Sequence, residues 1–309
     1  MINDLVSVII PVYNRENLIT DTVNSVLNQS YSNIECIIVD DRSSDNTFSI
    51  LNDLSRKDPR IKVLKRPYFL KKGANSCRNY GFKFSNGEFI TWFDSDDIMT
   101  YNSILSRLFL LKTLDLDFII GRINNFIFSP LENFNQKKTI LVPTSNNPAC
   151  EYLIGNFWFH TSSPLFKRVY LKKFKKHFDR DISFHDEGEF FIRLLLKSPK
   201  ISYTENIVTL RRMHNISVSY VYNSDFESEK LLKDHYGSLK IWLSFKKSNL
   251  FYNDELQLFF KYYFKRWILK MKLNSLRLIW ILYLGIKYNM FDDNLKFTKI
   301  VCWRILKSK

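Results

Sequence analysis

Residues 5–13 have the sequence LVSVIIPVY, which is rich in β-branched side chains and almost wholly apolar. A strand of this composition is typical of parallel sheets that are covered by helices on both faces. Residues 34–39 (IECIIV) and residues 88–93 (EFITWF) have the same character. These segments predict the central strands of an α/β sheet, with Pro11 near the end of the first strand.

Helical patterns separate the predicted strands. We expect a helix that opens at Glu16 or Asn17 and ends at Leu27, and a second helix capped by residues 44–47. A short strand at residues 61–64 and a loop and helix at residues 73–84 follow. Alternation of this kind predicts parallel strands joined by right-handed crossovers. Farther along, residues 189–197 have a helical pattern and residues 201–212 a strand pattern.

Acidic residues follow two of the buried strands. Asp40 and Asp41 end the second, and the segment Asp94-Ser95-Asp96-Asp97 follows the strand at residues 88–93. Ligands of open α/β sheets bind beyond the carboxyl ends of the strands. Carboxylate oxygens suit Mg²⁺ or Mn²⁺, which keep coordination positions open for phosphate oxygens. The segment 94–97 therefore predicts a metal site, and the alternative is an acidic turn that caps the next helix.

Three further segments carry candidate chemistry. Arg78 follows Gly73 in a loop that leads into a helix, and an arginine fork suits a phosphate. Asp186 and Glu187 precede an apolar helix and are candidate general bases, although acids are also favoured in a helix's first turn. Residues 211–219, RRMHNISVS, form a basic segment able to hold a diphosphate. An ordinary basic surface loop remains the alternative for the arginine-bearing segments.

The order of these segments is more specific than any one of them. It comprises residues 8–14 (VIIPVYN), 38–45 (IVDDRSSD), 73–81 (GANSCRNYG), 93–97 (FDSDD) and the pair Asp186-Glu187. Together they resemble the inverting family 2 glycosyltransferases of GT-A fold, over residues 5–222. Residues 163–168 (SPLFKR) also resemble a strand and turn of the bacterial members. The resemblance implies a GT-A nucleotide-diphospho-sugar transferase fold at residues 1–222, with a helical appendage at residues 223–309.

The resemblance also implies roles for individual residues. Asp41 accepts a hydrogen bond from the uracil ring, Tyr13 lies near that ring, and Arg78 lies near the diphosphate. The metal ligands implied are Asp96, Asp94 and His214. The donor-binding residues implied are Pro11, Tyr13, Asp40, Asp41, Arg78, Asp94, Ser95, Arg212 and Ser217.

The implied reaction is a single displacement. Glu187, with Asp186 as its rival, deprotonates an acceptor hydroxyl that attacks a UDP-hexose, and Mn²⁺ or Mg²⁺ stabilises the departing diphosphate. Glucose and galactose are the expected sugars. Two departures bear on this expectation: the family's common acidic pair is Glu then Asp, and Arg42 stands where the family commonly has glycine.

The C-terminal region is basic and aromatic. Residues 256–309 contain twelve lysines and arginines against two acids, and the whole chain carries a net charge of +15. Helices of this composition are expected to lie on an anionic membrane surface. We therefore expect a cytoplasmic protein that is peripheral on the inner face of the inner membrane, with a lipid-diphosphate-linked saccharide as acceptor. The longest apolar run, residues 278–286, is too short for a transmembrane helix.

Two rival functions follow from the same features. A basic nucleic-acid-binding protein would explain the charge, but acids at strand ends would repel phosphates. A nicotinamide oxidoreductase is disfavoured because Asn14-Arg15-Glu16 follows the first strand in place of a glycine-rich loop. No nucleic-acid partner is therefore expected.

Overall fold

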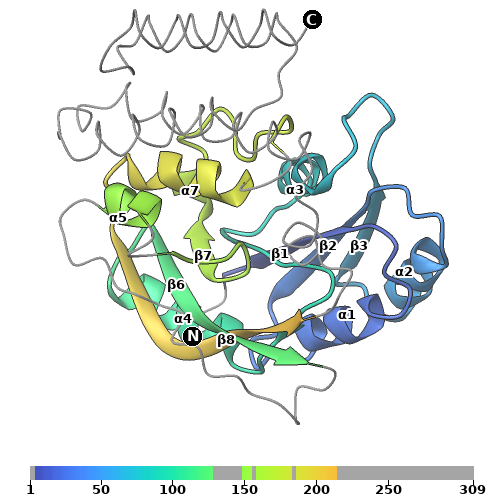
Figure 1. Cartoon of the computed structure of the whole chain (residues 1–309). Helices are drawn as coiled ribbons and strands as arrows, with labels where there is room; N and C mark the ends of the chain where they lie inside the picture. Colours follow the sequence, from blue (N-terminus) through green and yellow to red (C-terminus); the bar gives the residue numbers. More distant parts are fainter. Residues whose placement is uncertain (1–3, 128–147, 155–157, 183–185, 214–309) are drawn as a thin grey trace, which may run out of the picture. The chain divides into compact units, whose positions relative to one another are not determined.

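The computed structural model describes residues 4–127, 148–154, 158–182 and 186–213 (Figure 1). These residues all belong to the first of two units into which the chain divides, residues 1–223. Among them, no helix has the length and apolar character needed to cross a bilayer. The predicted appendage at residues 223–309, together with His214 and Ser217, lies outside the described residues.

Strands and helices alternate through the first part of the chain: β1 (Val6–Val12), α1 (Ile19–Leu27), β2 (Ile34–Asp40), α2 (Thr47–Lys57), β3 (Ile61–Lys65), α3 (Ala74–Lys83) and β4 (Phe89–Trp92). A mixed part follows: β5 (Ile98–Met99), α4 (Ser103–Thr113), β6 (Phe118–Ile127), α5 (Pro148–Ile154), β7 (Pro164–Lys167), α6 (Arg168–Leu171), α7 (Asp186–Leu195) and β8 (Ile201–Met213).

Within the described residues the strands form one eight-stranded sheet in the order β3-β2-β1-β4-β7-β6-β8-β5. The first four strands of this order are parallel, as the sequence pattern predicted. Strand β7 is antiparallel to both β4 and β6, and β5 is antiparallel to β8. The carboxyl ends of β1, β2 and β4 therefore meet at one edge of the parallel half.

The two faces of β1 bury different partners. Val8 and Ile10 belong to the same buried cluster as Val23 of α1 and Leu108 of α4. On the opposite face α3 lies so close to the sheet that a Cβ at Gly81 would collide with the side chain of Ile9. Figure 1 shows the resulting layers, with α1, α2 and α4 on one side of the sheet and α3, α5 and α7 on the other.

Aromatic packing fixes the second helical layer. Trp92, the last residue of β4, is fully buried, and its ring meets Phe178 and Phe190 edge to face at centroid distances of 5.0 and 5.7 Å. Phe190 lies on α7, and Phe178 lies in the segment that precedes it. Aromatic burial of this kind supplies a large apolar contact with defined geometry. It holds α7 and its approach next to the end of β4.

The first predicted helix begins later than expected. Helix α1 starts at Ile19, and the residues before it form a turn in which Leu18 N–H and Ile19 N–H both donate to Arg15 O, at 3.0 and 2.9 Å. Glu16 is engaged elsewhere, since its Oε2 accepts from Asn46 N–H at 2.9 Å. The predicted opening at Glu16 or Asn17 therefore lies two to three residues before the observed start of the helix.

Candidate active site

The loops after β1 and β2 are bound to each other. Asn14 N–H donates to Ser43 Oγ at 3.0 Å, and Ser44 N–H donates to Asn14 Oδ1 at 2.9 Å. Arg15 N–H donates to Thr47 Oγ1 at 2.7 Å. These contacts join segments that lie about thirty residues apart in sequence. The loops after β1 and β2 therefore form one connected edge of the sheet, which we call the rim.

The third strand end places two carboxylates against two arginines. Asp94 Oδ1 accepts from Arg78 Nη2 of α3 at 3.0 Å, and Asp96 Oδ2 accepts from Arg15 Nη2 at 3.3 Å. The side chains of Asp94 and Asp96 are 29% and 19% exposed. Both carboxylates thus keep access to solvent while the charge of each is opposed by an arginine from a different segment of the chain.

Asp97 has a different environment from its neighbours. It is 3% exposed, and its Oδ1 accepts from the backbone N–H of Arg212 on β8 at 3.0 Å. Burial, followed by the nearby Asp96 and Asp94 carboxylates, raises the pKa of Asp97 well above its usual range. Asp97 therefore ties the acidic segment to β8.

The backbone of the acidic segment is held from two sides. Thr22 Oγ1 of α1 donates to Ser95 O at 3.1 Å and to Asp97 O at 2.9 Å. On the other side, Arg212 Nε donates to Asp96 O at 3.1 Å, and its guanidinium carbon lies 5.0 Å from the ring centroid of Phe126. These contacts place Arg212 beside the acidic segment. The predicted contact of Arg212 and Ser95 with the donor stays a prediction.

The acids that end β2 are enclosed. Asp40 is fully buried, and both of its oxygens accept from Ser43 N–H at 3.2 Å. Asp41 is 4% exposed; it pairs with Arg66 and accepts from Gly73 N–H at 2.8 Å. A carboxylate has further lone pairs for a base N–H. Donor binding by Asp40 and Asp41 stays a prediction.

Arg42 keeps the backbone conformation of a glycine. Its φ is +63°, in the left-handed region that side chains rarely adopt. Its guanidinium carbon lies 3.0 Å from the ring centroid of Tyr68. The loop thus retains a turn that suits glycine, although the sequence departs from the family there.

The end of β1 exposes one aromatic ring. Tyr13 is 39% exposed, and Lys72 Nζ lies 3.9 Å from its ring centroid. Pro11 is buried within β1, opposite Val39 of β2. Proline has no N–H, and at this position the N–H would point toward β4, as the carbonyl of Ile9 does where it accepts from Phe93 N–H. The paired register of β1 and β4 ends at Ile9, so Pro11 removes no hydrogen bond from the sheet. Tyr13 is thereby placed on the rim, with Lys72 over its ring.

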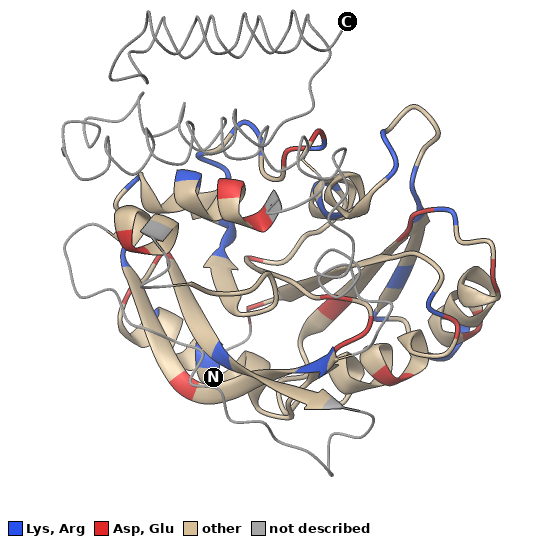
Figure 2. Ribbon diagram, in the orientation of Figure 1, with Lys and Arg blue, Asp and Glu red and all other residues tan. Residues whose placement is uncertain are grey.

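The candidate bases lie in the first turn of α7. The sequence placed Asp186 and Glu187 before the helix, but α7 begins at Asp186. Figure 2 marks acidic residues in red at the start of this helix. Glu187 is partly exposed. Carboxylates are stabilised at a helix N-terminus by its dipole, which accounts for the position without excluding a catalytic role.

Three residues near these loops were missed from the sequence. Arg15 and Arg66 each follow the end of a strand, so the strand-end rule that identified the acids applies to them equally. His160 had no such signal. Burial, followed by the charge of Arg211, lowers the pKa of His160 to about 4, and the Asp94 carboxylate opposes that shift. His160 is therefore neutral near pH 7, and its ring lies 5.5 Å from that of Trp158.

The donor set at the end of β4 suits a hard cation. The described residues contain no group of three or more His, Cys, Asp or Glu side chains that could enclose a metal by themselves. Mg²⁺ is usually held by one or two carboxylates, together with substrate phosphates and water. Asp94 and Asp96 supply oxygen ligands of that kind. His214, the third predicted ligand, lies outside the described residues.

Known proteins match this chain in sequence. A family model described as Glycosyl transferase family 2 matches residues 7–179. The glycosyltransferase GlyG of Streptococcus pneumoniae is 30% identical over 222 residues, which are 68% of this chain and 71% of that protein. The Escherichia coli UDP-Glc:alpha-D-GlcNAc-diphosphoundecaprenol beta-1,3-glucosyltransferase WfgD is 41% identical over 125 residues, 39% of this chain and 47% of that protein.

Solved structures match the fold. Staphylococcus aureus TarS in complex with UDP has a TM-score of 0.63 at 17% identity, covering 87% of this chain and 75% of that one. A mannosyltransferase of Pyrobaculum calidifontis in complex with GDP-Man and Mn²⁺ has a TM-score of 0.58 at 16% identity, covering 96% of this chain and 84% of that one. The predicted GT-A fold is confirmed. Because the family model spans more than half of its length, the chain belongs to glycosyl transferase family 2.

Proposed function

We propose that the protein transfers a hexose from a UDP-sugar, glucose or galactose, to a hydroxyl of a lipid-diphosphate-linked saccharide. The product is a β-linkage in a bacterial surface polysaccharide such as an O-antigen. The observation that carries the proposal is the end of β4, where Asp94 and Asp96 each meet an arginine from another segment of the chain and remain partly exposed. The name of the Escherichia coli relative, which gives a UDP-glucose donor and a diphosphoundecaprenol-linked acceptor, supports the choice of substrates.

The donor is proposed to lie across the rim formed by the ends of β1, β2 and β4. Tyr13 stacks on the uracil and Asp41 accepts from its ring N–H. Arg78, already next to Asp94, binds the diphosphate. The remaining donor contacts of this proposal are Pro11, Asp40, Asp94, Ser95, Arg212 and Ser217.

A divalent cation, Mn²⁺ or Mg²⁺, fits the same site, with Asp96, Asp94 and His214 as its ligands. When bound, it supplies charge neutralisation for the departing diphosphate. The Thr22 and Arg212 contacts keep the acidic segment fixed, so that Asp94 and Asp96 are held in place for the cation. Preorganised charge of this kind costs no reorganisation at the moment of reaction.

The proton of the acceptor hydroxyl passes to a carboxylate at the start of α7. Glu187 is the proposed base, with Asp186 as the alternative. The deprotonated hydroxyl attacks the anomeric carbon from the face opposite the UDP. One displacement inverts that carbon, so that an α-linked donor gives a β-linked product.

Residues 1–222 are proposed as the catalytic domain and residues 223–309 as a region that binds the anionic inner leaflet. The composition of residues 256–309 supports this part of the proposal. The protein is then peripheral on the cytoplasmic face of the inner membrane, where a lipid-linked acceptor is accessible. Flotation with anionic liposomes tests this, because a chain ending at residue 222 is expected to lose binding, and unchanged binding would refute it.

Transfer itself is tested by a donor screen with several UDP-sugars, Mn²⁺ and a lipid-diphosphate-linked acceptor. We expect Glu187→Gln to lower kcat by about 10²- to 10⁴-fold, the usual contribution of a general base. Asp186→Asn is the matched control and is expected to retain most of the activity. The opposite ranking would assign the base to Asp186, and full activity of both variants would refute a base on α7. Binding of random DNA without any UDP-sugar turnover would favour the nucleic-acid alternative.

A further inference from the structure

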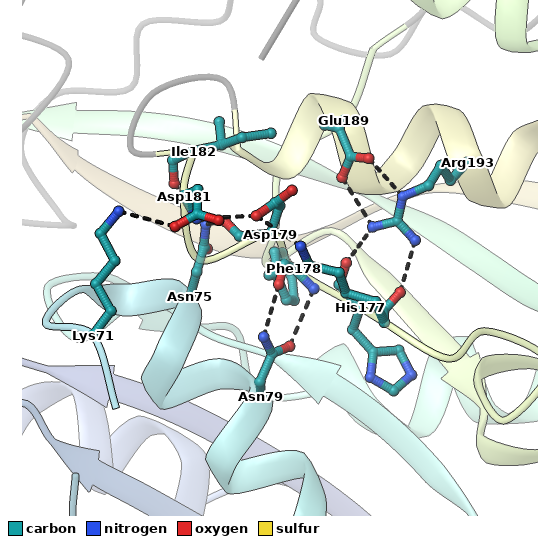
Figure 3. A network of polar contacts seen from close by, with 11 residues as sticks. Lys71, Asn75, Asn79, His177, Phe178, Asp179, Asp181, Ile182, Glu189 and Arg193 are labelled. Atoms are coloured by element: carbon teal, nitrogen blue, oxygen red, sulfur yellow. Dashed lines mark hydrogen bonds and ion pairs between the residues drawn. The ribbon is translucent and has the colours of Figure 1, made fainter. Parts of the chain in front are cut away.

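The segment between Lys176 and Ile182 is held on both sides by polar side chains (Figure 3). It leads toward α7, which begins at Asp186 with the two candidate bases. On the α7 side, Arg193 pairs with Glu189 through two nitrogens, at 2.7 and 2.9 Å. The same guanidinium donates to Lys176 O at 2.7 Å and to His177 O. The beginning of the segment is thereby fixed to α7.

Two asparagines of α3 hold the segment from the other side. Asn79 forms a closed pair with Phe178, since Asn79 Nδ2 donates to Phe178 O at 2.7 Å and Phe178 N–H donates to Asn79 Oδ1 at 3.1 Å. Asn75, one turn earlier, donates through Nδ2 to Asp179 O at 2.8 Å and to Ile182 O at 3.0 Å. Asn75 is 5% exposed, so these bonds form away from bulk water.

Asn75 differs from Asn79 in its third contact. Asn75 Oδ1 accepts from Arg78 Nη1 at 3.1 Å, and Arg78 Nη2 donates in turn to Asp94 Oδ1 at 3.0 Å. An asparagine amide has two N–H donors and one oxygen, and all three are engaged. A single side chain thus joins the arginine proposed to bind the diphosphate to the backbone that precedes the proposed base.

We propose that Asn75 is a positioning residue that sets the distance between the leaving-group side of the site and the base on α7. The inference rests on the proposed function. Transfer requires the acceptor oxygen, the anomeric carbon and the base to be in line, and a displacement of about 1 Å can cost about 10²-fold in rate. With both Nδ2 bonds gone, the 179–182 backbone loses its link to Arg78 while the donor site keeps its own residues.

The test compares kcat, the donor KM and the dissociation constant of UDP in the full-length protein with Mn²⁺ present. Asn75→Ala removes all three bonds of the amide. Asn75→Asp keeps an oxygen for Arg78 but loses the two donors to Asp179 O and Ile182 O. Asn79→Ala is the matched control, because it removes two part-buried bonds to the same segment from the same helix, and neither of those bonds involves Arg78.

We expect both Asn75 variants to lower kcat by about 10- to 100-fold, and Asn75→Asp, which keeps an oxygen for Arg78, to have a UDP dissociation constant within about threefold of wild type. Asn79→Ala is expected to lower the melting temperature by about as much as the Asn75 variants do, but to keep kcat within about threefold of wild type. A wild-type kcat in Asn75→Asp, or an equal loss of kcat in Asn79→Ala, would overturn the positioning role and leave the proposed function intact. A wild-type protein that transfers no sugar would overturn the proposed function and, with it, this inference.

Discussion

At the end of β2, Asp40 is fully buried and Asp41 is 4% exposed, whereas at the end of β4 the side chains of Asp94 and Asp96 are 29% and 19% exposed. The partners differ as well. Asp40 accepts from Ser43 N–H within its own loop, whereas Asp41 accepts from Gly73 N–H and from the buried Arg66, which lie beyond β3. Asp94 and Asp96 face Arg78 of α3 and Arg15 of the loop after β1.

The difference shows that similar acidic strand ends can serve different purposes. A buried carboxylate whose oxygens are paired with neighbouring strand ends holds those ends together, and this describes the β2 acids. A carboxylate that remains partly exposed can add a cation to its existing partners, and this describes Asp94 and Asp96. The β4 acids therefore have the exposure that a metal site requires, whereas the β2 acids join the loops around it.

Replacement of Asp96 is the most direct test of the difference between the acids that follow β4 and those that follow β2. We expect Asp96→Asn to lower kcat/KM for transfer by about 10²- to 10³-fold, since charge stabilisation at a leaving group contributes that much. The melting temperature is expected to stay near the wild-type value, because the side chain is partly exposed. Asp53→Asn, on the exposed side of α2, is the charge-matched control. Full transfer activity in Asp96→Asn would contradict the assignment.

The β2 end is expected to respond in stability. Arg66→Ala leaves Asp41 buried without its cation, and the loss of one partner from a buried pair costs about 3–5 kcal/mol of unfolding free energy. Urea denaturation measures this cost. Arg56→Ala breaks the exposed Arg56–Asp53 pair, whose side chains are 75% and 54% exposed, and is expected to cost under about 0.5 kcal/mol. Equal costs in the two variants would remove the distinction between the strand ends.

Asp97 sharpens the comparison through pH. Burial raises the pKa of Asp97 in the folded protein above its usual range. At a pH between the pKa of the unfolded chain and that of the folded protein, the folded state therefore binds more protons than the unfolded state. Stability is therefore lost as pH rises through that window. In metal-free buffer, Asp97→Asn is expected to be more stable than wild type at neutral pH, and the difference should shrink as the pH falls toward 4. Parallel stability curves for the two proteins would argue against a buried, high-pKa carboxyl.

Much of the parallel half was predictable because its signals are local. The apolar run of β1 and the acids that end β2 and β4 lie within single short segments, and the structure confirms the strands there. The insertion of β7 between β4 and β6 was not predictable, because strand order depends on contacts between distant segments.

The environment of each acid also lay beyond the sequence. Arg15 and Asp96 are 81 residues apart, and Arg66 and Asp41 are 25 apart, so no local pattern records either pair. Asp186 and Glu187 were recognised as acids near a helix, but their place inside its first turn depends on where α7 begins. The sequence therefore indicated where the acids lie, while their exposure and their partners depend on the fold.

Calorimetric titration of UDP, with and without Mn²⁺, tests the central claim that the β4 end is the metal and nucleotide site. We predict that wild type binds UDP more tightly when Mn²⁺ is present, and that Asp96→Asn abolishes this enhancement while the protein stays folded. UDP binding that is indifferent to Mn²⁺ in wild type, or an enhancement that Asp96→Asn retains in full, would contradict the account.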